Sequence, residues 1–204
     1  MKILIAVPTF ENIMPDTYKS IWDMDKAGCE IEFEYVRGYD VARARNIIAH
    51  KAINAETDYV LMIDNDMTIP KDALVNLLDD PKEICLGYYA HRSANNDYTG
   101  VTSICKLGEY NYTKQFSAKE VAELKAKGVK KFQIHGGGMG CALIKTSLFK
   151  RLQFPYFKWE NYDSGYCLSE DLYLCENCRK AKVPVYSDTR VGCGHLLRKT
   201  YWPE

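Results

Sequence analysis

The sequence of 204 residues has no long hydrophobic run and no net charge. A helix that crosses a bilayer needs about 20 consecutive apolar residues, and no stretch approaches that length, so we expect no transmembrane segment. The 27 lysines and arginines balance the 27 aspartates and glutamates. No overall field therefore draws the protein toward nucleic acid or anionic lipid, and we expect no nucleic-acid partner.

The N-terminal segment lacks the features of an export signal. Residues 1–8 contain one lysine and an apolar run that is too short for a signal peptide. We therefore expect a cytoplasmic protein, in which thiols stay reduced. The eight cysteines are predicted to be free thiols, mostly buried in strands and helices.

The most informative stretch is a short apolar run that ends in acidic residues. Five apolar residues, Tyr59–Ile63, lead directly into Asp64, Asn65 and Asp66. The run predicts a strand that is buried on both faces. In open α/β sheets ligands bind at the carboxyl edge of the strands, where two close carboxylates suit a hard divalent cation such as Mn²⁺ or Mg²⁺ carrying phosphates.

The pattern around this strand predicts one α/β domain over residues 1–204, because no internal repeat or low-complexity linker divides it. Strands and helices alternate up to Ile63, which favours a mostly parallel central sheet flanked by helices. A small β/α insert is expected around 92–130. The expected elements of the first part are strands at 2–7, 31–36 and 59–63 and helices at 17–24 and 41–54.

Two segments are expected near the carboxylates. Pro8 and Thr9 leave the first strand at the same edge of the sheet. Arg45 and Asn46 lie near the start of the helix at 41–54, where an arginine opposes the helix dipole unless an anion is close. A solvated helix face explains the arginine equally well.

The C-terminal part contains two carboxylates and a histidine that are candidate site residues. Glu170 and Asp171 open a predicted helix, where they either cap it or supply a general base to an acceptor hydroxyl. The preceding segment, 162–166, is aromatic, as a wall that faces substrate would be. His195 lies between a glycine and an apolar pair, and it becomes a metal-ligand candidate if the chain folds back to the aspartates.

Other interpretations compete with a diphosphate site. Cys175 and Cys178 have zinc-ligand spacing, but they fall inside a helical pattern and lack a second pair. The Asp-x-Asp-x-Thr pattern that begins at Asp64 matches the opening motif of haloacid-dehalogenase-type phosphatases, in which Asp64 would be the nucleophile. A non-catalytic module that binds nucleotide or sugar is the third alternative.

Taken together, these motifs resemble those of the GT-A glycosyltransferases, most closely the family 2-like enzymes. The resemblance rests on Val7–Asn12 as the first-strand signature, Ala44-Arg45-Asn46 as the Ala-Arg-Asn helix, Asp64-Asn65-Asp66 as the DxD motif, Ser169-Glu170-Asp171 as the xED motif, and the late His195. Their order and spacing carry the match over most of the chain.

The resemblance implies a nucleoside-diphosphate sugar as donor, most often a UDP-sugar, held through Mn²⁺ or Mg²⁺, and a sugar or glycan acceptor. It implies a nucleotide-binding half at 1–90 and an acceptor-binding and catalytic half at 91–204, with Gly136, Gly137, Gly138 and Gly140 letting the acceptor approach the backbone. The implied metal ligands are Asp64, Asp66 and His195; the implied catalytic residues are Asp171, as base of an inverting enzyme, and Glu170 beside it. The implied donor-binding residues are Pro8, Thr9, Glu11, Asp40, Arg45, Asn46, Asp64, Asn65 and Lys199.

Overall fold

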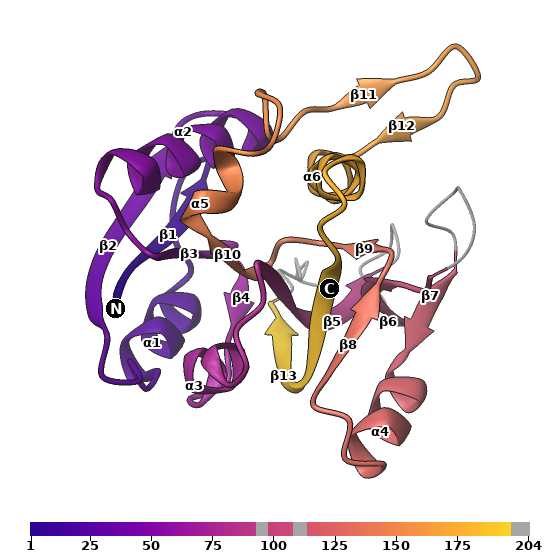
Figure 1. Ribbon diagram of the computed structural model, residues 1–204. Helices are drawn as coiled ribbons and strands as arrows, with labels where there is room; N and C mark the ends of the chain where they lie inside the picture. Colours follow the sequence, from indigo (N-terminus) through magenta and orange to yellow (C-terminus); the bar gives the residue numbers. More distant parts are fainter. Residues whose placement is uncertain (93–97, 108–113, 197–204) are drawn as a thin grey trace, which may run out of the picture.

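A computed structural model describes residues 1–92, 98–107 and 114–196 (Figure 1). The first part of the chain alternates strands and helices as the sequence predicts. Its elements are β1 (Lys2–Thr9), α1 (Pro15–Asp23), β2 (Glu30–Arg37), α2 (Val41–Asn54) and β3 (Tyr59–Ile63). β1 lies between β2 and β3 and pairs with both in parallel, so the β-α-β-α-β arrangement is confirmed.

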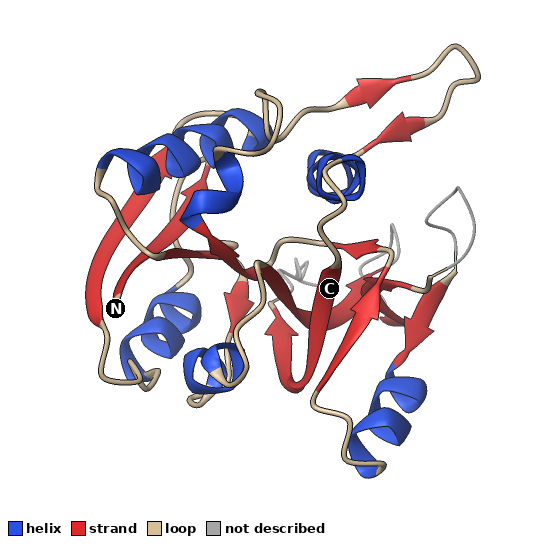
Figure 2. Ribbon diagram, viewed as in Figure 1, coloured by secondary structure: helices blue, strands red, loops and turns tan. Residues whose placement is uncertain are grey.

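The rest of the chain extends this sheet and adds a hairpin, with helices between (Figure 2). The elements are β4 (Met67–Thr68), α3 (Ala73–Leu78), β5 (Ile84–Arg92), β6 (Tyr98–Cys105), β7 (Gln115–Ser117), α4 (Ala118–Ala126), β8 (Lys131–Ile134), β9 (Gly136–Gly137), β10 (Cys141–Lys145), α5 (Thr146–Phe149), β11 (Glu160–Asn161), β12 (Cys167–Leu168), α6 (Glu170–Lys180) and β13 (Val185–His195).

The strands of the main path lie in the order β2-β1-β3-β10-β5-β13-β4. β10 runs antiparallel to both β3 and β5, whereas β13 runs parallel to β5. The last residues of β13 turn to pair with β4 in antiparallel fashion. The expectation of an α/β fold with a central sheet that is mostly parallel at its core and flanked by helices is confirmed, and the antiparallel strand β10 makes the whole sheet mixed.

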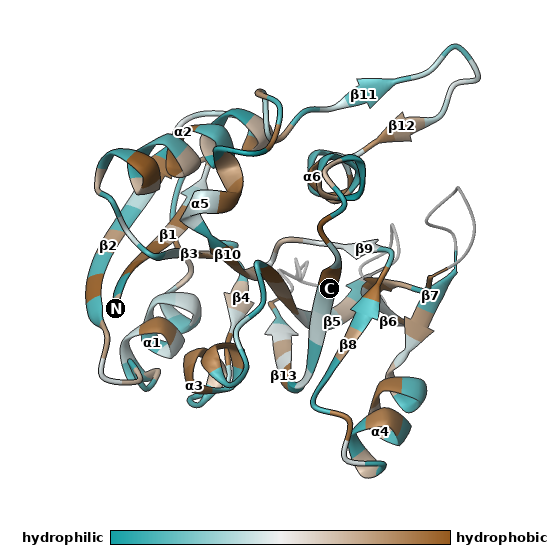
Figure 3. Ribbon diagram, in the orientation of Figure 1, coloured by the Kyte–Doolittle hydropathy of each residue, from teal (hydrophilic) through white to brown (hydrophobic). Residues whose placement is uncertain are grey.

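Alternating residues of the central strands build one hydrophobic core on each face of the sheet. Val60 and Met62 of β3 join the core formed with α2, α5 and α6, whereas Leu61 and Ile63 join the core formed with α1 and α3. Figure 3 shows the matching pattern on the helices, which are hydrophobic along one side and hydrophilic along the other. Burying one such side chain stabilises the fold by about 1.5–3 kcal/mol.

The region expected as an insert contains β6, β7 and α4. Residues 93–97 and 108–113 of this insert lie outside the described residues. Ser117 caps α4 as its sequence pattern predicts: its hydroxyl accepts a bond of 3.2 Å from the backbone N–H of Glu120, and the Glu120 carboxylate accepts one of 2.9 Å from the backbone N–H of Ser117.

The eight cysteines are free thiols, and six of them are buried. Cys175 and Cys178 lie within α6, on its buried side. In the part of the chain that the structure describes, the helices are all too short or too polar to cross a bilayer.

Candidate active site

The turn that carries the DxD motif is anchored to the loop that follows β1. The side-chain amide of Asn65 donates to the Asn12 carbonyl at 2.8 Å and to the Thr9 hydroxyl at 3.3 Å. The Asn65 carbonyl in turn accepts from the backbone N–H of Met14 at 3.0 Å and from the Thr17 hydroxyl at 3.0 Å. The ends of β1 and β3 therefore form one hydrogen-bonded unit, so the carboxylates beside Asn65 have fixed positions.

A first cavity of about 330 Å³ opens at this edge. It is lined by Pro8, Thr9, Phe10, Tyr39, Asp40, Val41, Asp64, Asn65 and Asp66. Asp40 also caps α2, because its carboxylate accepts a bond of 3.1 Å from the backbone N–H of Arg43. Three carboxylates therefore face a cavity that is large enough for part of a nucleotide.

The late histidine folds back to the second aspartate of the motif. β13 pairs with β4 so that His195 lies opposite Met67, and the backbone N–H of Leu196 donates to the Asp66 carbonyl at 2.8 Å. As a result, His195 Nε2 lies 3.5 Å from Asp66 Oδ2. His195 was a candidate metal ligand if the chain folded back to the aspartates, and the chain does fold back to Asp66.

The other ring nitrogen of His195 fixes which tautomer faces Asp66. Nδ1 lies 3.3 Å from the Ala90 carbonyl oxygen, which can only accept, so Nδ1 carries the proton in this bond. In the neutral ring, Nε2 then carries the lone pair and can act as a metal ligand beside the Asp66 carboxylate. Two facing lone-pair donors, one nitrogen and one oxygen, fit a divalent cation that takes its other ligands from phosphate and water.

Asp64, the first aspartate of the motif, is bonded to a buried arginine, whereas Asp66 lies beside His195. Arg45 is 2% exposed, and its guanidinium donates to Asp64 Oδ1 at 2.7 Å and to Glu170 Oε1 on α6. Burial alone would lower the pKa of Arg45, but the two carboxylates raise it above its usual value. Burial raises the pKa of Glu170, and Arg45 opposes that rise. Arg45 therefore lies beneath the site as an ionic bridge between the two acidic motifs.

Within the described residues, no group of three acidic, histidine or cysteine side chains is close enough to hold a metal ion. Of the three implied metal ligands, Asp66 and His195 are brought together, and Asp64 is bonded to Arg45. A cation at this position would therefore rest on two protein ligands, which is typical of sites where the diphosphate completes the coordination.

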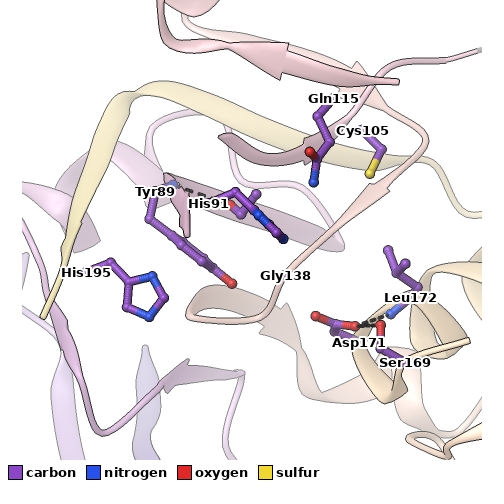
Figure 4. Close-up of a pocket in the computed structure, with 10 residues that line it drawn as sticks. Tyr89, His91, Cys105, Gln115, Gly138, Ser169, Asp171, Leu172 and His195 are labelled. Carbon is purple, nitrogen blue, oxygen red and sulfur yellow. Dashed lines mark hydrogen bonds between the residues drawn. The ribbon is translucent and has the colours of Figure 1, made fainter. Parts of the chain in front are cut away.

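A second cavity of about 390 Å³ is bordered by His195 (Figure 4). It is lined by Tyr89, His91, Ser103, Cys105, Gln115, Gly138, Ser169, Asp171, Leu172 and His195. His195 thus borders the second cavity, whereas its neighbour Asp66 borders the first. The Asp66–His195 pair is the junction between the two cavities.

Asp171 presents one oxygen to the second cavity. Its Oδ1 accepts bonds from the backbone N–H of Leu172, at 2.8 Å, and from the Ser169 hydroxyl. Its Oδ2 is directed toward Gly138, where a Cβ added to the glycine would lie 3.5 Å away. The carboxylate is held by one oxygen and open at the other, as a general base requires.

Tyr89 forms the floor of the second cavity. Its ring packs edge-on against His195, with ring centroids 5.3 Å apart, and its hydroxyl points toward the space in front of Asp171 (Figure 4). A Cβ at Gly138 would lie 2.0 Å from the Tyr89 hydroxyl, and one at Gly140 would lie 2.7 Å from the ring. The close approach that these glycines permit is therefore used by Tyr89.

Two of the residues implied by the resemblance, Asn46 and Glu11, lie outside the lining of both cavities. Asn46 holds the 156–157 backbone: its carbonyl accepts from Tyr156 N at 2.9 Å, and its amide donates to the Phe157 carbonyl at 2.7 Å. Glu11 is exposed and lies outside the lining of the first cavity. Lys199 lies outside the described residues. The roles of these three in donor binding stay predictions.

Tyr89, His91 and Gln115 were not predicted as site residues. A signal was present for the first two, because they lie near the carboxyl end of β5, the edge at which ligands bind in α/β sheets. Gln115 gave no such signal, since it reaches the cavity through the pairing of β7 with β6.

No protein-family model and no curated protein sequence matches the chain. Solved structures do. Over 97% of this chain and 87% of the other, it superposes on A197 from STIV with a TM-score of 0.62 at 15% identity. It superposes on GalNAc-T7 with UDP, GalNAc and Mn²⁺ with a TM-score of 0.62 at 12% identity, over 96% of this chain. It superposes on S. aureus TarS with a TM-score of 0.50 at 14% identity, also over 96% of this chain.

These likenesses establish the fold: the chain has the GT-A fold of glycosyltransferases, as the motifs indicated. The chain covers 43% of the GalNAc-T7 chain and 60% of the TarS chain. It therefore corresponds to part of the length of those two proteins, and their activities enter below only as support for a proposal.

Proposed function

We propose that the protein is a metal-dependent glycosyltransferase that moves a sugar from a nucleoside-diphosphate sugar to the hydroxyl of a sugar or glycan. The observation that carries the proposal is the Asp66–His195 pair, 3.5 Å apart, at the junction of two cavities. Transfer between two substrates needs two adjoining sites, with the leaving diphosphate at the boundary between them.

The first cavity is assigned to the donor nucleotide, with UDP favoured. Asp40, Asp64 and Asp66 make its lining acidic, and none of its described lining residues is basic. A diphosphate is repelled by such a lining unless a cation lies between them. Asp66 and His195 would hold Mn²⁺ or Mg²⁺, which when bound supplies charge stabilisation to the leaving diphosphate. A related fold crystallised with UDP and Mn²⁺ supports this assignment.

The second cavity is assigned to the transferred sugar and the acceptor. Asp171 Oδ2 takes the proton of the acceptor hydroxyl, the acceptor oxygen forms a bond to the anomeric carbon, and the bond from that carbon to the diphosphate oxygen breaks with its electron pair. Attack opposite the leaving group inverts the anomeric centre. Glu170 faces Arg45 beneath the site rather than the cavity, so we assign it to positioning Arg45.

The phosphatase alternative is disfavoured by the surroundings of Asp64. The buried Arg45 guanidinium that is bonded to Asp64 Oδ1 withdraws charge from this carboxylate, which weakens it as a nucleophile. The motif also follows the third strand of the chain rather than the first. A non-catalytic binding module differs from the proposal in lacking turnover, which the experiments below measure.

The test is isothermal titration calorimetry with UDP, GDP and CDP, each with Mn²⁺ and with EDTA. We expect one nucleotide, UDP first, to bind only with Mn²⁺. Asp66→Ala and His195→Ala should each weaken that binding at least about tenfold, because each removes one of two protein ligands. Glu123→Ala, on the exposed side of α4, is the matched control and should bind as the wild type does.

Two results would overturn the proposal. The first is that no nucleotide binds in any condition. The second is that a nucleotide binds equally well with EDTA and in Asp66→Ala. Turnover of a phosphate monoester that is lost in Asp64→Asn would establish the phosphatase alternative instead.

A further inference from the structure

The hairpin formed by β11 and β12 projects from the body of the molecule beyond α6 (Figure 1). Glu160 pairs with Leu168, and Asn161 pairs with Cys167. The pairing continues at the next position, where the backbone N–H of Tyr162 donates to the carbonyl of Tyr166 at 2.9 Å. The two tyrosines therefore lie opposite each other at the end of the ladder.

The direction of the tyrosine side chains follows from this register. In a hairpin, alternate residues of each strand and their cross-strand partners share one face. Tyr162 and Tyr166 therefore share a face with Leu168, which is 2% exposed because it packs against the body. The tyrosines are thus on the side of the hairpin that faces the molecule.

A second observation connects the hairpin to the second cavity. Leu168 of β12 is followed directly by Ser169, which precedes α6 and lines that cavity together with Asp171. The hairpin therefore extends outward from the wall of that cavity.

The chemistry of this face fits a neutral carbohydrate. Tyr162 and Tyr166 are 46% and 42% exposed, and their ring centroids lie 5.8 Å apart with planes tilted by 31°. Aromatic faces with polar hydroxyl tips match the apolar C–H faces and hydroxyl rims of sugar rings. Tyr162 donates its hydroxyl to Glu160 Oε2 at 3.2 Å, and Glu160 Oε1 accepts from Lys158 Nζ at 3.4 Å. Each carboxylate oxygen keeps a further lone pair that can accept from a sugar hydroxyl.

The charge of the hairpin argues against other partners. Residues 160–168 include Glu160 and Asp163 and contain no lysine or arginine. Nucleic acid, phosphorylated acceptors and anionic lipid surfaces all require positive charge to bind. A neutral glycan requires none.

We propose that the β11–β12 hairpin is a glycan-binding subsite, and that the acceptor is a neutral oligosaccharide whose terminal residue reaches Asp171 while its preceding residues stack on Tyr162 and Tyr166. This inference rests on the proposed function, because it names the class of acceptor for the same site. It predicts that affinity for the acceptor increases with the length of the glycan.

The experiment measures direct binding of the whole protein to immobilised neutral mono- to hexasaccharides of glucose, galactose, mannose and xylose, without donor. The wild type should bind at least one oligosaccharide series more tightly than its monosaccharide. The double variant Tyr162→Ala/Tyr166→Ala should lose at least about tenfold of that affinity. Trp22→Ala, which removes a 72% exposed aromatic residue from α1, is the control and should bind normally.

Further arms separate this inference from the proposed function. Tyr166→Phe keeps the ring and should keep most of the oligosaccharide affinity. Mn²⁺-dependent UDP binding should be unchanged in the double variant, which shows that it is folded. The inference is overturned if the wild type binds no oligosaccharide while UDP binding is intact, or if the double variant binds as well as the wild type. If the wild type does not bind UDP but binds glycans through the two tyrosines, the proposed function is refuted and the glycan-binding subsite is supported.

Discussion

The two cavities of the site are built in different ways. The first is lined by residues between Pro8 and Asp66, from the ends of neighbouring parallel strands and the start of α2. The second is assembled from β5, β6, β7, α6 and the end of β13, which are spread over more than half of the chain. The cavity lined by three aspartates thus arises from contiguous β-α-β units, whereas the cavity that holds Asp171 depends on long-range pairing.

The cavities also differ in charge. Asp40, Asp64 and Asp66 line the first, whereas Asp171 is the one carboxylate among the described residues that line the second, where it accompanies two histidines. An acidic cavity can accept a diphosphate only together with a cation, but a sugar hydroxyl needs a single base. The difference in lining therefore matches a division between metal-bound donor and neutral acceptor.

The largest expected effect separates the cavities by function. Asp171→Asn removes the base while keeping the size of the side chain, so sugar transfer to an acceptor should fall by about 10²–10⁴-fold. UDP binding with Mn²⁺, measured by calorimetry, should be unchanged, because Asp171 lies outside the first cavity. Equal losses of transfer and UDP binding would contradict this separation.

The next effect concerns the ionic bridge beneath both cavities. Arg45→Met leaves Glu170 buried without its partner, which should lower the free energy of unfolding by about 3–5 kcal/mol in urea denaturation. Adding Glu170→Gln should recover part of the loss. Arg151→Met, which removes an exposed pair with Glu83, should cost less than about 1 kcal/mol. A small loss in Arg45→Met would show that the bridge is not important to the fold.

A smaller effect is expected in the floor of the second cavity. Gly138→Ala places a Cβ 2.0 Å from the Tyr89 hydroxyl, so Tyr89 must shift, and the variant should lose about 1–3 kcal/mol of stability. Removing the hydroxyl in Gly138→Ala/Tyr89→Phe should restore part of that stability. The measurement is thermal and urea unfolding of both variants. An unchanged stability in Gly138→Ala would show that the glycine is not needed for this packing.

The smallest effect is expected at α4, away from both cavities. The side chain of Lys106, followed by the backbone and hydroxyl of Ser117, lowers the pKa of Glu120 to about 2 from its usual 4.5. A depressed folded-state pKa stabilises the fold above pH 4.5, and this contribution is lost as the pH falls toward 2. Glu120→Gln should abolish that part of the acid dependence, at a cost below about 1 kcal/mol at neutral pH, and leave UDP binding unchanged.

The first half of the fold was predictable because its signals are local. The apolar run of β3, the helix at 41–54 and the Asp-x-Asp turn are each visible in a few consecutive residues. Parallel pairing of the three strands then places Thr9, Asp64 and Asp66 at one edge without further information.

The second half was less predictable because its geometry depends on pairings with weak local signals. β4 has two residues, and the later part of β13 contains Asp188, Arg190 and two glycines, a composition unlike that of a buried strand. The Asp188 carboxylate can be buried because the Arg190 guanidinium pairs with it at 2.7 Å. The return of His195 to Asp66 was therefore stated only as a condition.

The burial of Arg45 was missed although a signal existed. Arg45 lies three residues from both Ala42 and Ile48 on α2, and those two residues face the core. An arginine on the buried face of a helix needs acidic partners, and the sequence offers many. Which of them lie within reach depends on where α6 packs, and that is decided by the whole sheet.

The central claim is that one cation site at Asp66 and His195 joins a donor cavity to an acceptor cavity. Anomalous diffraction at the manganese edge, from crystals grown with UDP and Mn²⁺, tests it directly. We predict a manganese peak between Asp66 Oδ2 and His195 Nε2, with the uridine in the cavity lined by Thr9 and Asp40. A manganese peak elsewhere, or a nucleotide bound outside that cavity, would contradict it.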